Sequence, residues 1–208
     1  MGIRSRRTLF YQEVLQAWDS ACSQVLIKNP KTSERFDAFA EDLLAERSAR
    51  PLVIVAASKV DHLLLEALRR FLLPKIARAN DQDELLEGYT PLGTLGARIK
   101  MCRRLGLIDE SLYVTLERLR ALRNLSAHAI SFDATQSPAR EHFSELRKRI
   151  ASRDSYCLTK ERYFGSGFLQ PMEEMQCLML TLCVLLEAIR DAVVPTLGNK
   201  HALRIAGK

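Results

Sequence analysis

The segment CLMLTLCVLLEAI, Cys177 to Ile189, is the most apolar stretch of the sequence and restricts most strongly the folds open to the chain. It is shorter than the roughly 20 residues that a bilayer-spanning helix needs. A helix that is apolar on all sides is stable in water only when other elements enclose it. We therefore expect a buried central helix and no membrane contact. Charged residues lie close to both ends of the apolar run: Glu173 and Glu174 before it, Glu187 near its end and Arg190 directly after it.

Helical periodicity also organises the rest of the 208 residues, and no stretch alternates apolar and polar residues for long enough to predict a sheet. The sequence predicts an all-α fold in a single domain, residues 1–208, with flexible ends at 1–7 and 196–208. Prolines, glycines and capping residues divide the chain into about seven helices. The expected helices cover residues 8–29, 33–47, 51–73, 91–105, 110–128, 138–150 and 172–194.

The expected helix at 91–105 carries several boundary signals. Thr90 suits the N-cap, Pro91 suits the first helical position and Gly106 suits the position just beyond the end. Gly93 and Gly96 lie one turn apart inside this helix. Because glycine lowers helix stability, we expect a neighbouring helix or a ligand to approach closely there.

Residues 152–171, SRDSYCLTKERYFGSGFLQP, form the least regular stretch, and we expect a long loop here. Aromatic residues alternate with cations along it. This arrangement either anchors the loop to the core or stacks on unpaired nucleic-acid bases, and the first interpretation is favoured.

Positive charge gathers in clusters on a chain whose formal net charge is +6. Such clusters suit an acidic partner such as nucleic acid, and a solvated helix face explains them equally well. The cations that we take as candidate binding residues are Arg98, Arg103, Arg104, Arg147, Lys148 and Arg149.

The five cysteines form no CxxC pair and lie mostly in apolar helical stretches. They predict buried thiols in a reducing compartment, without a disulfide framework or a metal site. The N-terminal sequence MGIRSRRTLFYQEV carries charge but no apolar run after it, so no secretion signal is expected. We expect a cytoplasmic protein that needs no cofactor.

The sequence RNLSAH, Arg123 to His128, places an arginine and a histidine near the end of the expected helix at 110–128. At about 100° per residue, Arg123 falls in the same stripe as the buried leucines and should point toward the core. A buried guanidinium needs a carboxylate, for which Asp61 is the first candidate and Glu66 the second. His128 falls on another face, so the two side chains meet only if the helix bends or a second subunit lies alongside.

Such an arginine and histidine suit RNA cleavage without a metal. A histidine can move protons to and from the 2′-hydroxyl and the leaving oxygen, while an arginine stabilises the phosphate in the transition state. The alternative is structural: a buried arginine that bridges helices and a histidine that caps carbonyl groups at a helix end.

The segment from Leu52 to Ala129, and above all PLGTLGARI followed by LGLI and the Arg-to-His stretch, resembles the mannitol operon repressor (MltR) family. That resemblance implies an all-helical regulator of transcription of sugar-alcohol uptake genes. RNLSAH also resembles the motif of HEPN domains, which are helical dimers with a composite ribonuclease site. By that likeness Arg123, Asn124 and His128 would form the catalytic site and Asp61 would be the supporting acid. Many HEPN relatives are not catalytic.

The two helices around RRLGLIDESLYV resemble a helix-turn-helix, but the would-be recognition helix carries Asp109, Glu110 and Glu117, which phosphates would repel. Sequence-specific DNA binding is therefore not expected. The sequence favours a non-enzymatic regulator that forms a homodimer with a HEPN-like core and binds a protein or RNA. The alternative is a metal-independent endoribonuclease with a dimeric Arg123/His128 site.

Overall fold

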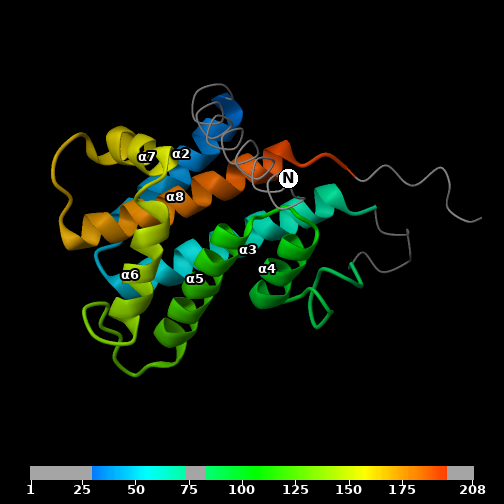
Figure 1. Cartoon of the computed structure of the whole chain (residues 1–208), viewed down its shortest axis with the longest axis horizontal. Helices are drawn as coiled ribbons and strands as arrows, with labels where there is room; N and C mark the ends of the chain where they lie inside the picture. The colour runs from blue at the N-terminus through cyan, green and yellow to red at the C-terminus, as the bar shows by residue number, and fades with distance from the viewer. Residues whose placement is uncertain (1–29, 74–82, 196–208) are drawn as a thin grey trace, which may run out of the picture.

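The computed structural model describes residues 30–73 and 83–195, and these residues form seven helices and no strand (Figure 1). The all-α prediction is confirmed. The helix expected at 8–29 and the ends 1–7 and 196–208 lie outside the described residues. The helices are α2 (Pro30–Ala45), α3 (Ala49–Phe71), α4 (Leu95–Arg104), α5 (Glu110–His128), α6 (Ala139–Ile150), α7 (Asp154–Phe164) and α8 (Pro171–Ala192).

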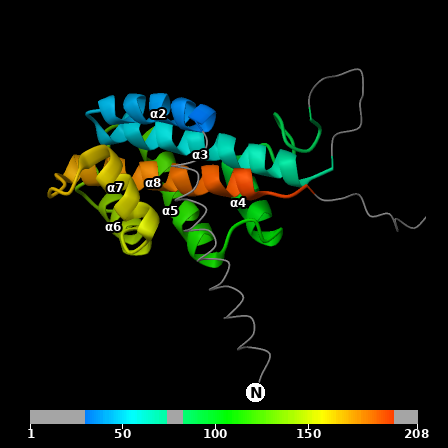
Figure 2. The same ribbon diagram turned by 90° about the horizontal axis from the view of Figure 1, so that it is seen from above.

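Helix α8 is the central element, as its apolar sequence predicts. Every residue from 176 to 189 is buried. Helix α3 runs along α8 (Figures 1 and 2), and α2, α6 and α7 also pack on α8. Among the described helices, none combines the length and the apolar character that a membrane crossing requires.

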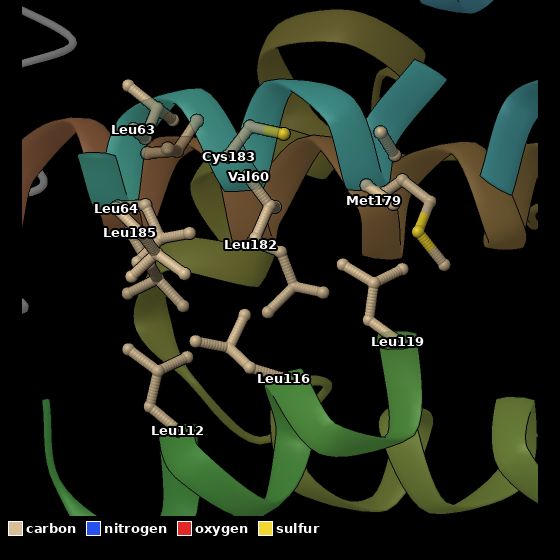
Figure 3. Packing of buried hydrophobic residues seen from close by; sticks show 14 of the residues in the cluster. Val60, Leu63, Leu64, Leu112, Leu116, Leu119, Met179, Leu182, Cys183 and Leu185 are labelled. Atoms are coloured by element: carbon tan, nitrogen blue, oxygen red, sulfur yellow. The ribbon is translucent and has the colours of Figure 1, made fainter. Parts of the chain in front are cut away.

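The core lies where α3, α5 and α8 meet (Figure 3). Leucines dominate it, and burying each one contributes about 1.5–3 kcal/mol relative to an exposed side chain. This packing fixes the position of α5 against α3, which matters because the candidate site lies between them. The central side chains are Val60, Leu63 and Leu64 of α3, Leu112, Leu116 and Leu119 of α5, and Met179, Leu182 and Leu185 of α8.

Ion pairs supplement the apolar contact between α3 and α8. Lys59 Nζ lies 2.8 Å from Glu187 Oε1, and Arg190 Nη1 lies 3.1 Å from Glu66 Oε2. Arg190 also pairs with Glu187. Glu66 is thus a partner of Arg190, so its assignment as the second candidate partner of Arg123 is wrong.

The boundaries of α4 differ from the prediction at one end. The helix begins at Leu95 with Thr94 as its N-cap, and Thr94 Oγ1 accepts from Ala97 N at 3.2 Å. Thr90 instead closes the preceding turn, because its hydroxyl donates to Leu85 O at 2.9 Å. Gly93 therefore lies before the helix and only Gly96 lies inside it. At the other end the prediction is confirmed, since Gly106 has a φ of 73°.

Helix α7 replaces most of the loop that the sequence predicts at 152–171. Its polar residues Ser155 and Thr159 are buried. Tyr163 donates its hydroxyl to Asp37 Oδ1 at 2.8 Å, and Arg162 Nη2 lies 2.9 Å from both carboxylate oxygens of Asp37. Aromatic and cationic residues of this stretch thus anchor α7 to α2. Helix α2 begins at Pro30, three residues before the start that the sequence predicts at 33.

Candidate functional site

Arg98 is buried, with 6% of its surface exposed, and all of its bonds are internal. Nη1 donates to Asp61 Oδ2 at 2.6 Å, Nε donates to Leu92 O at 2.9 Å and Nη2 donates to Leu86 O at 2.9 Å. The partner of Asp61 is thus Arg98, and the prediction that Asp61 pairs with Arg123 is wrong. Arg98 also does not belong to a surface cluster of binding residues, because it is buried and its guanidinium bonds to groups inside the fold.

Arg123 is exposed and lines a cleft of about 400 Å³ between α3, α4 and α5. The prediction that Arg123 points into the core is wrong, because α3, α4 and α5 leave a cleft at this level of α5 and the side chain is exposed there. The one hydrogen bond of its side chain among the described residues is a long one, from Nη1 to Asn124 Oδ1 at 3.4 Å. The residues that line the cleft are Ala57, Ser58, Asp61, Gly93, Thr94, Leu95, Gly96, Arg120, Arg123 and Asn124.

The two glycines of the cleft both lie where other atoms approach the backbone closely. A Cβ atom at Gly96 would lie 3.2 Å from Cδ of Arg120, so the arginine side chain crosses α4 at this point. A Cβ atom at Gly93 would collide with the carbonyl oxygen of Gly88. The expected close approach at Gly96 is therefore made by α5, and at Gly93 by the chain's own preceding turn.

Arg120 is a cleft residue that the sequence reasoning did not select. Its Nη2 donates to Glu117 Oε2 at 2.7 Å, and this hydrogen bond raises the pKa of the guanidinium. Arg120 lies about one helical turn before Arg123 and Asn124. A search of the same face of α5, one helical turn before Arg123, would have identified Arg120.

His128 does not line the cleft that Arg123 and Asn124 share. It is the last residue of α5 and is exposed. The carbonyl groups that follow it are bound by Arg50, whose Nη2 donates to Ala129 O at 2.8 Å and to Ile130 O at 3.2 Å. Arg50 thus caps this end of α5, the role that the structural alternative gave to His128. One copy of the chain brings Arg123, Asn124 and Asp61 to one cleft, and His128 lies apart.

The other candidate binding cations are on the surface, mostly beside carboxylates. Arg103 Nε donates to Glu110 Oε2 at 2.8 Å, and Arg147 Nε lies 2.6 Å from Glu174 Oε1. Lys148 and Arg149 both pair with Glu145, at 2.9 and 3.5 Å. Arg104 is exposed. Paired charges of this kind are held in place by their partners and contribute little stability each.

A second hollow of about 480 Å³ lies on α6 and the neighbouring face of α5. Arg118, Arg140 and Lys148 line it together with Glu141 and Glu145. It also contains His142, whose pKa is lowered by partial burial and then by the charge of Arg118. The sequence analysis did not select Arg118, Arg140 or His142 as site residues. Within the described ranges, no three His, Cys, Asp or Glu side chains come close enough to hold a metal ion.

No protein-family model matches the sequence, and no curated protein matches it. Two solved structures resemble the fold. A chain in the X-ray structure of the MtlR-HPr complex from Escherichia coli is 23% identical with a TM-score of 0.51, and the match covers 74% of this chain and 98% of that one. A possible transcriptional regulator, YggD from Shigella flexneri 2a str. 2457T, is 16% identical with a TM-score of 0.50, covering 75% of this chain and 97% of its own. The expected likeness to MltR proteins is therefore confirmed at the level of the fold.

Proposed function

We propose that this chain is a non-enzymatic regulatory protein that acts as a helical dimer by binding a protein partner. The observation that carries the proposal is the fold match over nearly the whole of a chain whose structure was solved in the MtlR-HPr complex. A fold that presents a protein-binding surface in one relative supports a similar use in another, although fold alone does not fix function. HPr is accordingly the first partner to test.

The basic hollow on α5 and α6 is the surface that best suits such a partner. Arg118 and Arg140 form no ion pair with another described residue, in contrast to Arg147 and Lys148. Partial burial lowers the pKa of His142 in this hollow, and the charge of Arg118 lowers it further. A cationic hollow of this kind attracts an acidic protein surface and orients it.

Titration calorimetry with HPr from the organism that encodes this chain tests the proposal. We expect binding that weakens about tenfold in an Arg118→Gln/Arg140→Gln double variant, because two charge-assisted contacts are lost. Arg47→Gln removes an exposed charge elsewhere and should leave the affinity unchanged. Absence of binding by the folded wild-type protein would contradict an HPr partner, and equal affinity of all three proteins would place the contact elsewhere.

The endoribonuclease alternative has one specific observation in its favour, which is that Arg123 and Asn124 face one polar cleft. It needs a second subunit, because His128 does not line that cleft. Labelled RNA incubated with the protein in chelator separates the two functions. We expect no cleavage; cleavage by the wild type, with cyclic phosphate ends and none with Arg123→Ala or His128→Ala, would show an enzyme.

We do not propose that α5 reads DNA directly. Asp109 Oδ1 accepts from Leu112 N at 2.6 Å, so this carboxylate caps the start of α5. Glu110 follows it and pairs with Arg103. Negative charge at the end that would enter a DNA groove opposes phosphate contact.

A further inference from the structure

The cleft between α3, α4 and α5 has three walls of different chemistry. Helix α3 contributes Ser58 and Asp61, the start of α4 contributes the backbone around Gly93 and Gly96, and α5 contributes Arg120, Arg123 and Asn124. Figure 1 shows α4 and α5 beside α3, and all three pairs of helices are in contact. At about 400 Å³ the cleft falls within the size range of small-molecule sites.

The charges of the cleft leave one cation without a carboxylate. Asp61 is neutralised by Arg98, and Arg120 is neutralised by Glu117. Arg123 forms no ion pair with any described residue, and its only polar contact there is the long one to Asn124. The cleft therefore carries a net positive charge, located on the α5 wall.

Neutral polar groups lie beside this charge. The hydroxyl of Ser58 donates to Ile54 O at 2.9 Å, so its oxygen keeps a lone pair that can accept. The amide nitrogen of Asn124 forms no hydrogen bond with another described residue, so it keeps its donors. A ligand that carries hydroxyl groups next to an anionic group would satisfy both.

We propose that this cleft binds a small organic anion that carries hydroxyl groups. Its phosphate or carboxylate group would contact Arg123 and Arg120, and its hydroxyl groups would contact Asn124 and Ser58. The carboxylate of Asp61 would disfavour a second anionic group at the α3 wall. This inference rests on the geometry of the cleft and is independent of the proposed HPr contact.

The test is a titration of the isotope-labelled protein followed by NMR, with four probes. Glycerol 3-phosphate and glycerate carry both an anion and hydroxyl groups, inorganic phosphate lacks the carbon-bound hydroxyls and glycerol lacks the charge. We expect at least one of the first two to shift the backbone signals of Gly93 and Gly96 and to bind more tightly than phosphate or glycerol.

Arg123→Gln should weaken that binding about tenfold, because it removes a charge-assisted contact. Arg47→Gln is the matched control, because Arg47 is exposed and does not line the cleft, and this variant should bind like the wild type. Gly96→Ala gives a second line of evidence, since the added methyl group displaces Arg120 and should also weaken binding.

The proposal is overturned if neither hydroxylated anion shifts the cleft signals at about 20 mM. That concentration is well above the dissociation constant of even a weak small-molecule site. It is also overturned if Arg123→Gln and Arg47→Gln bind alike. A short RNA that shifts the same signals where the small anions do not would exclude the small ligand and favour the endoribonuclease alternative.

Discussion

Arg98 joins three parts of the molecule through one guanidinium group. It bonds to the carboxylate of Asp61 on α3 and to the carbonyl groups of Leu86 and Leu92 in the segment before α4. Arg98→Met keeps much of the side-chain volume but leaves a carboxylate and two carbonyls without their donor. We expect the free energy of unfolding to fall by about 3 kcal/mol, measured by urea denaturation.

Arg104→Met is the control for this change, because it removes an exposed arginine of the same helix. Its effect should stay within about 0.5 kcal/mol. A loss below about 1 kcal/mol for Arg98→Met would mean that the Asp61 contact does not hold the segment in place.

The buried thiols make stability depend on alkaline pH. Burial raises the pKa of Cys177 to about 11, and of Cys102 and Cys183 to about 12, from an ordinary value of 9.0. Below pH 9 both states keep these protons; above it the unfolded chain loses them first, so stability falls as pH rises. We expect a loss of about 1 kcal/mol per thiol between pH 8 and 10, measured by urea denaturation. The slope should be smaller in Cys183→Ala, and an unchanged slope would contradict the assignment.

The turn that follows α4 depends on the backbone conformation of Gly106. Gly106 has a φ of 73°, and no other atom lies within 4 Å of the position where a Cβ would be. The cost of Gly106→Ala is therefore backbone strain alone, about 1 kcal/mol of unfolding free energy. Gly167→Ala is the matched control, since that glycine has equal space and no positive φ. The midpoint of thermal denaturation should be lower than that of the wild type for Gly106→Ala only. Equal midpoints for the two variants would contradict the prediction.

Local sequence signals located the helices well where long-range contacts agree with them. Asp109 and Gly106 do what their residue types predict, as N-cap of α5 and as the turn after α4. Thr90 does not act as an N-cap, because its hydroxyl closes a turn at Leu85. Arg98 holds this turn in place by a bond to Leu86 O, 12 positions away in the sequence. Helix α7 was missed for the same reason: its bonds to Asp37 join residues 125 and 126 positions apart. No local pattern reports such partners.

The candidate site was predictable in part. The leucine stripe of α5 predicts a buried Arg123, and that prediction is wrong because the side chain is exposed at a cleft. Gly96 correctly marks a close approach. The partner of Asp61 could not be chosen from residue types, since Arg98 and Arg123 are chemically equal candidates. Only the packing of α4 on α3 decides between them, because it places Arg98 2.6 Å from that carboxylate and leaves Arg123 at a cleft.

The geometry of the proposed dimer decides whether Arg123 of one subunit and His128 of the other can share one site. A two-fold axis near the end of α5 would place the partner's copy of this segment beside the cleft. Ile130 follows α5 and is fully exposed, as an apolar contact residue would be in an isolated copy. We expect sedimentation to give about twice the 23.6 kDa mass of one chain.

Ile130→Glu should then shift the protein toward the monomer, because a charge in a buried apolar contact is costly. Phe168→Glu is the matched control, since Phe168 is equally exposed but lies between α7 and α8. A dimer that resists Ile130→Glu but is lost in Phe168→Glu would place the axis far from α5 and remove the basis of a shared Arg123/His128 site. A dimer lost only in Ile130→Glu would keep that site geometrically open, so that the RNA assay alone decides between regulator and enzyme.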